Sequence, residues 1–187
     1  MEQIVRKFKV MRGTFEMIYP FTTFSCVFEA EKLPESPNKV LQKYLRDVLT
    51  QGVPPGERAS VSQLPKIMVE KVEVQSDFIE MARLANYRGL GKGQHECVQN
   101  YLLLNDPHTI AIEIPVWDEN HLGHIDNIRI KDDKIGVWDF KPNAAKETKA
   151  SGQVLRYVLM LSKALNLPLR MFEGGYYDDT NAYLIKF

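Results

Sequence analysis

Hydrophobic residues in the first part of the chain follow two successive patterns. The first thirty residues carry β-branched and aromatic runs separated by glycine and proline, which predicts two or three short strands. Apolar positions then recur every three or four residues, with Ser36-Pro37 and Gly52 as start and stop signals. We expect a helix there that packs through Val40, Leu41, Tyr44, Leu45, Val48 and Leu49.

The middle of the chain alternates extended and helical patterns. Residues 65–74 are typical of an extended segment, and residues 77–88 of a helix capped by Ser76. A glycine-rich turn then leads into a second helix, whose Val98, Tyr101 and Leu102 face inward. The glycines of that turn do not have the spacing of a phosphate-binding P-loop.

The C-terminal half begins with a period of two. The isoleucines and valine between residues 110 and 116 fall on one face of a strand and Glu113 on the other, which predicts a half-buried strand carrying one carboxylate. A hairpin over residues 123–142 follows, then a long helix from about Ala144 to Leu165, and finally a strand, a turn and a strand. This order predicts an α/β sandwich.

Composition limits the function classes. The 187 residues fit one domain, and 24 basic against 24 acidic residues leave no global positive charge. A polyanion would therefore have to be held by a local patch. Two distant cysteines indicate neither a disulfide framework nor a metal cage, and the N-terminus has no signal-peptide core, so we expect a cytoplasmic protein without a membrane contact.

The hairpin carries the first sign of chemistry. If residues 131–134 form its loop, Ile130 faces Ile135, and the same register places Asp126 opposite Asp139, with their β-carbons about 5 Å apart. Like charges so placed repel each other unless a cation lies between them. Lys141 projects to the same face as Asp139. The alternative interpretation is a surface hairpin in which Lys141 simply neutralises one aspartate.

Further candidate residues lie outside the hairpin. Gln153 and Tyr157 are four residues apart and share one face of the following helix, with Lys149 or Ala150 one turn earlier. His95, near the start of its own helix, offers an imidazole, and Glu113 offers another carboxylate.

Together these residues resemble a known family. Gly91 or Gly93 with His95-Glu96 on a helix, Gly123-His-Ile-Asp126 on a strand, Asp139-Phe-Lys141 on the next and Gln153-x-x-x-Tyr157 on a helix stand in the order of the RecB-like branch of the PD-(D/E)XK nuclease superfamily. The match covers roughly residues 90–187. It implies a restriction-endonuclease-like α/β core with a mixed central β-sheet flanked by helices, and an N-terminal strand and helix elaboration over residues 1–89.

The resemblance also implies roles for the residues. Asp126, Asp139 and Lys141 would be catalytic, and Mg²⁺ or Mn²⁺ would be bound by His95, Asp126, Asp139 and the backbone carbonyl of Phe140. Glu113 and Glu96 are possible additional ligands. The residues expected to contact nucleic acid are Gln153, Tyr157, Lys149 and Arg156.

Two departures from the family narrow these expectations. Some standalone relatives use four cysteines for an iron–sulfur cluster, so with two cysteines we expect no cluster here. Larger relatives are fused to helicase modules, whereas this chain has no Walker motif, so unwinding would need a partner such as a helicase or another repair or recombination protein. The sequence leaves the oligomeric state open, a homo-oligomer included.

The leading hypothesis is a metal-dependent deoxyribonuclease that acts as an exonuclease on single-stranded DNA or DNA ends. A structure-specific endonuclease of the same superfamily and a non-catalytic nucleic-acid-binding module on the same fold are the alternatives. A third alternative is a structural protein whose hairpin carries only a salt-bridge cluster.

Overall fold

The computed structural model describes residues 10–17, 22–29 and 39–187. Its strands and helices, in chain order, are β1 (Val10–Met17), β2 (Thr22–Glu29), α1 (Lys39–Gln51), β3 (Ala59–Ser60), β4 (Lys71–Glu73), α2 (Asp77–Arg88), α3 (Gln94–Asn105), β5 (Thr109–Trp117), β6 (His121–Lys131), β7 (Lys134–Phe140), α4 (Ala150–Leu165), β8 (Phe172–Tyr177) and β9 (Ala182–Ile185). Short 3₁₀ turns lie at Val61–Gln63, Ala144–Lys146 and Leu169–Met171.

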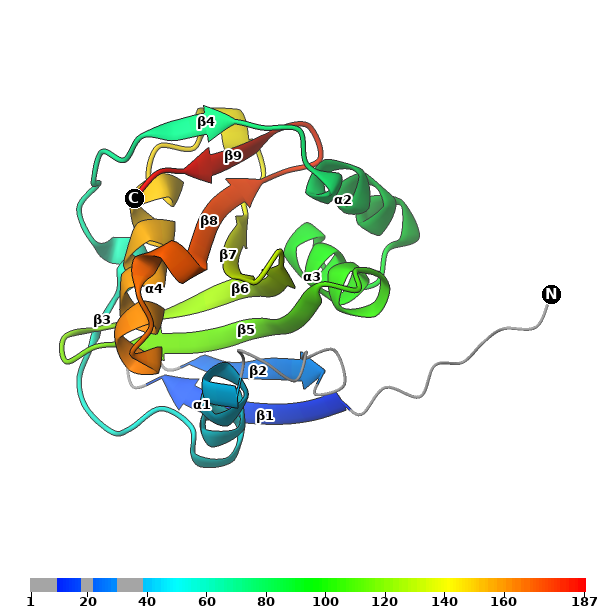
Figure 1. The fold of residues 1–187 in the computed structure, drawn as a ribbon. Coiled ribbons are helices and arrows are strands. Elements are labelled where there is room, and N and C mark those ends of the chain that lie inside the picture. The colour runs from blue at the N-terminus through cyan, green and yellow to red at the C-terminus, as the bar shows by residue number, and fades with distance from the viewer. Residues whose placement is uncertain (1–9, 18–21, 30–38) are drawn as a thin grey trace.

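The described strands form one mixed sheet (Figure 1). Its order is β1-β2-β5-β6-β7-β8-β9-β4, with β3 added beside β6. The pairs β7–β8 and β3–β6 are parallel, and the other described pairs are antiparallel. Parallel neighbours need a crossover connection, and α4 supplies it between β7 and β8. The predicted α/β class, with a mixed open sheet flanked by helices, is confirmed.

The described part of the N-terminal region is built into the same sheet. β2 pairs with β5, β3 with β6 and β4 with β9, so its strands meet the C-terminal strands at three places. α2 lies beside α3 (Figure 1). Residues 39–89 and 90–187 therefore share their sheet and their helical layers.

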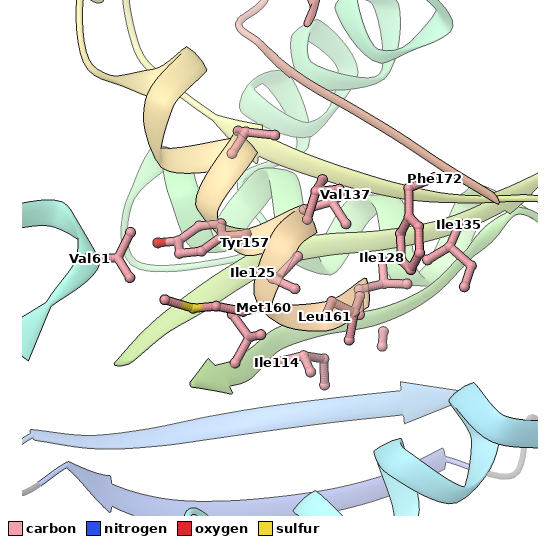
Figure 2. Packing of buried hydrophobic residues seen from close by; sticks show 14 of the residues in the cluster. Val61, Ile114, Ile125, Ile128, Ile135, Val137, Tyr157, Met160, Leu161 and Phe172 are labelled. Carbon is pink, nitrogen blue, oxygen red and sulfur yellow. The ribbon is translucent and has the colours of Figure 1, made fainter. Parts of the chain in front are cut away.

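The larger core lies between the sheet and the helices α1 and α4. Figure 2 shows Tyr157, Met160 and Leu161 beside Ile125 and Ile128 of β6. Leu41 and Leu45 of α1 are fully buried in the same cluster. Each fully buried aliphatic side chain of this kind stabilises the fold by about 1.5–3 kcal/mol, so this layer fixes how α4 lies across the strands.

A second core covers the opposite face of β7 and β8. Ile135 and Val137 belong to the first cluster, whereas Trp138 and Phe140 belong to the second, as alternation along a strand requires. Phe78 of α2 stacks on Tyr177 of β8 at 4.4 Å between ring centroids. This cluster attaches α2 and α3 to the strands that end at the candidate site.

A buried ion-pair network joins these helices to the sheet. Arg129 of β6 is 3% exposed and contacts Asp106, at the C-terminal end of α3, at 3.2 Å. It also pairs with Asp77, at the first turn of α2, at 2.5 Å, and its guanidinium lies 4.6 Å from the ring of Phe78. One side chain thus anchors two helix ends to β6.

Several local predictions are confirmed. The Ser76 hydroxyl accepts from the backbone N–H of Phe78 at the start of α2. Ile130 pairs with Ile135 in the hairpin. The turn itself consists of Asp132 and Asp133, both with positive φ, as a tight two-residue hairpin turn requires.

Other predictions need correction. Val40 is 44% exposed, so the packing face of α1 is narrower than the apolar pattern suggested. β5 is buried on both faces, because neighbouring strands and helices enclose it, and its alternation breaks at Glu113, whose φ is 53°. The predicted helix cap at Ser36-Pro37 lies outside the described residues.

The helix expected from Ala144 begins only at Ala150. Asn143 adopts left-handed backbone angles, a 3₁₀ turn covers Ala144–Lys146, and Glu147 is extended. The Ala144 N–H donates to Asp178, which fixes this turn to the end of β8. The hydrophobic period does not register such a break, because apolar spacing continues across it.

Among the described helices, none is long and apolar enough to cross a membrane.

Replacing Arg129 by methionine should destabilise the protein by about 3 kcal/mol, because a buried carboxylate at Asp106 loses its cation and Phe78 loses its guanidinium contact. Urea unfolding monitored by circular dichroism measures this change. Lys43→Met is the matched control: it removes an exposed pair with Asp47 and should cost less than about 0.5 kcal/mol. Equal effects of the two substitutions would contradict the anchoring role of Arg129.

Candidate metal centre

Three carboxylates from three adjacent strands lie in one row. The pairs Ile112–Asn127 and Ile114–Ile125 place Glu113 of β5 level with Asp126 of β6. The pair Asn127–Trp138 is the last of the β6–β7 ladder, and one further step along that register brings Asp126 level with Asp139. We call Glu113, Asp126 and Asp139 the acidic row. The register predicted from the sequence holds to the pair next to this row: the β6–β7 ladder ends at Asn127–Trp138, and the β5–β6 ladder skips Glu113 and Asp126.

Local backbone geometry accounts for the missing Glu113–Asp126 pair in the β5–β6 ladder. Glu113 adopts a left-handed φ that is costly for a residue with a β-carbon, at about 1–3 kcal/mol. The side chain of Gln99, from α3, donates to Glu113 Oε1 at 2.5 Å. On the other side, the backbone N–H of Phe140 donates to Asp126 Oδ2 at 2.8 Å, so the carboxylate of Asp126 takes up a main-chain donor at the end of β7.

His95 reaches the row from the first turn of α3. The preceding turn is tight: a β-carbon on Gly91 would come within 2.8 Å of the backbone nitrogen of Cys97. Glu96 accepts from the Lys92 N–H and so stabilises the turn. The imidazole Nε2 of His95 lies 3.0 Å from Asp126 Oδ2, and its Nδ1 lies 3.9 Å from Glu113 Oε1.

Asp139 and Lys141 complete the polar group. The Lys141 ammonium lies 2.6 Å from Asp139 Oδ2, which places both side chains on the same face, as their spacing predicts. The Asp139 side chain is 1% exposed, and within the described residues neither of its oxygens has a hydrogen-bond partner beyond this ion pair. Buried carboxylate oxygens are normally satisfied. Asp139 therefore retains binding capacity.

Burial and mutual repulsion control ionisation in the row. Burial and then the charge of Asp126 raise the pKa of Asp139 well above its usual value, and the same two causes raise the pKa of Glu113. Burial also acts to raise the pKa of Asp126, but the hydrogen bond and charge of His95, followed by the charge of Lys141, outweigh it and lower that pKa. The row therefore disfavours the ionised forms of Asp139 and Glu113.

The two basic groups respond in the opposite direction. Burial acts to lower the pKa of His95, but its hydrogen bond with Asp126 and the charges of the row raise it to about 9. Burial likewise acts to lower the pKa of Lys141, and the charges of Asp139 and then Asp126 raise it overall. Both groups are therefore held protonated by the acidic row in the metal-free protein.

The residues present fit a divalent cation. Ligand atoms of His95, Glu113 and Asp126 all lie within 4.8 Å of one another, and Asp139 borders this group with unsatisfied oxygens. Several carboxylate oxygens with one imidazole form a donor set suited to Mg²⁺ or Mn²⁺. A divalent ion would supply the positive charge that the row lacks.

The structure brings most of the predicted ligands together. His95 and Asp126 are in contact, Glu113 joins them, and Asp139 lies beside Asp126. Phe140 borders the group through its main-chain N–H and its ring, which packs against His95, while the metal-ligand role of its carbonyl stays a prediction. Glu96 is engaged in the turn before α3 and is not part of the group.

Tyr157 and Gln153 lie next to the row on the α4 side. Gln153 donates to the Tyr157 hydroxyl at 2.7 Å, and Tyr157 is 3% exposed. A β-carbon on Gly123 would come within 2.3 Å of the Tyr157 ring, which explains why glycine stands three residues before Asp126. Burial and then the charge of Asp139 raise the pKa of Tyr157. Tyr157 therefore packs beside the acidic row as a buried side chain, and its ring is not exposed to a ligand.

The remaining predicted contacts lie at the start of α4 and along it. Lys149 is the exposed residue before its first turn. Arg156 donates to the Pro65 carbonyl and thereby attaches α4 to the segment before β4. Gln99 is a site residue that the sequence argument missed, although its position one helical turn after His95 was a usable signal.

Comparison of the chain with protein-family models, with curated proteins and with solved structures gives no match. The geometry of the site therefore carries the functional argument.

In the metal-free protein, stability should fall as pH rises from about 6.5 to about 9. The pKa of His95 is about 9 in the folded state against 6.5 in the unfolded chain. The pair with Asp126 is thus fully stabilising below pH 6.5 and is lost as pH passes through 9. Because 42% of the His95 side chain is exposed, solvent screening limits the effect to about 1 kcal/mol. Urea unfolding in EDTA across this range measures it.

His95→Gln is the control, since glutamine keeps a polar side chain that does not titrate. Its stability should be flatter than that of the wild type between pH 6.5 and 9. Parallel curves for the two proteins would show that His95 is not the titrating group.

Proposed function

We propose that this chain is a divalent-metal-dependent nuclease that hydrolyses phosphodiester bonds in DNA. The observation that carries the proposal is the acidic row. Ligand atoms of His95, Glu113 and Asp126 lie within 4.8 Å of one another, and the buried Asp139, next in the row, pairs with Lys141. A cation resolves the repulsion within the row, and a phosphodiester brings negative charge to a site that then holds a metal and an ammonium group. The metal ion and the Lys141 ammonium group would thus serve both in binding the phosphodiester and in its hydrolysis.

We further propose that the fold is a PD-(D/E)XK core. In support, the histidine lies on α3, the first aspartate on β6, the second aspartate and the lysine at the end of β7, and the glutamine and tyrosine on α4. These are the elements that the family pattern assigns to each motif, and the crossover from β7 through α4 to β8 keeps α4 against the strands that carry the aspartates.

The residues divide the work of hydrolysis. When bound, a divalent ion lowers the pKa of a water molecule and polarises a phosphoryl oxygen. Asp126 and Asp139 would hold it together with His95. Lys141 keeps its proton beside Asp139, so it is suited to stabilising negative charge that develops on the phosphoryl group. Gln99 holds Glu113 at the row, and Tyr157 packs beneath it.

The competing interpretations differ in what they require of Asp139. A surface salt-bridge cluster would leave the aspartate solvated, whereas this one is buried. A non-catalytic binding module does not need a lysine held 2.6 Å from a buried carboxylate next to two further carboxylates. Exonuclease action on single strands or DNA ends is our proposal for the substrate, with a structure-specific endonuclease as the alternative that end-labelled DNA distinguishes.

Cleavage should depend on Asp139 and Lys141. With Mn²⁺ or Mg²⁺, the wild type should degrade end-labelled DNA, and Asp139→Asn or Lys141→Met should slow cleavage by about 100-fold to 1,000-fold, because each removes a charge that acts in the transition state. Gel analysis of single-stranded and double-stranded substrates measures the rates and the product ladder.

Asp133→Asn and Lys134→Met are the matched controls, since they make the same chemical changes at the exposed turn of the same hairpin. Both should cleave as the wild type does. Cleavage that survives in Asp139→Asn and Lys141→Met would refute the proposed site, and DNA binding without cleavage in either metal would favour the binding module.

Metal binding has a readout that does not need activity. At a concentration 100 times its dissociation constant, Mn²⁺ should stabilise the wild type by about 2.7 kcal/mol, and it should not stabilise Asp126→Asn. In EDTA, Asp139→Asn should be at least as stable as the wild type, because burial and the charge of Asp126 disfavour the ionised carboxylate. Thermal unfolding with and without Mn²⁺ tests both. If Asp139→Asn is less stable in EDTA and Mn²⁺ has no effect on the wild type, the row is a structural ion-pair cluster.

A further inference from the structure

A second polar site is lined in part by the segment that follows Lys141. A pocket of about 240 Å³ opens between the segment before β4, β4 itself and the start of α4. We call it the lysine pocket, and its lining residues are Lys66, Met68, Val69, Lys71, Ala145, Lys146, Glu147, Thr148 and Ser151.

Three lysines from three separate segments converge on this pocket. Within the described residues, Lys66, Lys71 and Lys146 form no ion pair with a carboxylate. Lys71 is held by aromatic side chains: its ammonium lies 4.3 Å from the ring centroid of Tyr183 and contacts the Tyr176 hydroxyl. Three lysines against one carboxylate, that of Glu147, leave a local excess of positive charge, which favours an anionic ligand.

The segments that carry the lysines are attached independently. Arg156 donates to the Pro65 carbonyl, and Gly152 lies against Ile67, where a β-carbon would come within 3.1 Å of the Ile67 carbonyl. The 3₁₀ turn that carries Lys146 is held by the bond from the Ala144 N–H to Asp178. The pocket is therefore formed before a ligand arrives, which reduces the ordering cost of binding.

The floor of the pocket offers unused donors. Ser151 is 9% exposed and lines the pocket, and its hydroxyl has no hydrogen bond to any described residue. It lies in the first turn of α4, which begins without a side-chain cap. Backbone N–H groups at such a helix start favour an anion. Glu147, the acidic lining residue, is already engaged by the Lys149 N–H.

The pocket is close to the acidic row along the chain. Lys146 follows Lys141 by five residues, so their α-carbons are at most about 17 Å apart. Glu147, which follows Lys146, also lines the pocket, so the segment after Lys141 leads directly to the pocket wall. One strand of nucleic acid can therefore contact both sites.

We propose that the lysine pocket binds a phosphate group of the nucleic-acid strand whose neighbouring linkage lies at the acidic row. The contact of the neighbouring linkage with the acidic row rests on the proposed nuclease function. Phosphate binding by the lysine pocket does not depend on that function. The phosphate is either an internal phosphodiester or a terminal phosphate, and these sources share the same chemistry.

Binding in EDTA tests the pocket separately from catalysis. The probe is a fluorescent oligothymidylate of about 12 nucleotides, with or without a 5′-phosphate, followed by anisotropy over a range of salt concentrations. Lys66→Ala/Lys146→Ala should weaken binding about 5-fold to 20-fold at low salt and reduce the slope of log affinity against log salt by about 1.4, since two phosphate contacts are lost. Lys134→Ala/Lys163→Ala, which removes two exposed lysines elsewhere, should bind as the wild type does.

The two phosphate sources separate in the same experiment. If removal of the 5′-phosphate weakens oligonucleotide binding by the wild type but not by the pocket variant, the pocket binds a terminal phosphate. If the wild type binds both oligonucleotides equally, the pocket binds an internal phosphodiester. Either result supports the pocket. Equal affinities and salt slopes for the pocket variant and the control variant would overturn it.

A second measurement separates this inference from the proposed function. Bis(p-nitrophenyl) phosphate has no neighbouring phosphate, so its Mn²⁺-dependent hydrolysis should be the same in the wild type and in Lys66→Ala/Lys146→Ala, whereas KM for the oligonucleotide should rise in the variant. An equal loss on both substrates would overturn the pocket as a separate phosphate site. A wild type that binds the oligonucleotide but hydrolyses neither substrate contradicts the nuclease proposal and leaves the binding result standing.

Discussion

The repulsion among Glu113, Asp126 and Asp139 is the constraint around which the C-terminal half of the structure is organised. Side chains level with one another on adjacent strands lie about 5 Å apart, and burial strengthens the repulsion between like charges at that distance. The protein answers with one imidazole and one ammonium group, from His95 and Lys141. Within the described residues, the buried Asp139 has no hydrogen-bond partner apart from its ion pair with Lys141. The divalent cation that we propose would place two positive charges at one position in the row.

Holding such a group together requires a rigid surrounding, and the fold supplies it from both faces of the sheet. On one face, α4 packs through a fully buried apolar layer and brings Tyr157 against Gly123. On the other, α3 carries His95 and Gln99, and its far end is fixed to β6 through Asp106 and Arg129. The position of the imidazole is thus determined by contacts at both ends of α3. The energy stored at the row is offset by ordinary packing and ion pairing away from it.

How much of this site the sequence could predict depends on the range of the interactions. The tight turn at Asp132-Asp133 and the β-branched residues beside it set the hairpin register, so the pairs down to Asn127–Trp138 followed from counting, and Asp126 and Asp139 are the next residues along each strand. Glu113 was harder, because its left-handed backbone and its alignment with Asp126 depend on how β5 pairs with β6, which alternation in β5 alone does not reveal. The late start of α4 depends on the bond between Ala144 and Asp178, two residues brought together only by the folded sheet.

The lysine pocket also depends on contacts between residues that are distant in the chain. No sequence motif indicated it, since Lys66, Lys71 and Lys146 are far apart in sequence. Their convergence follows from the pairing of β4 with β9 and from the break before α4, the two features that sequence patterns predicted least well. A chain with no net charge can bind a polyanion only where its cations are concentrated. In the lysine pocket they are concentrated beside Lys146, five residues beyond Lys141, so a strand held by its phosphates would meet the lysine pocket and the acidic row in succession.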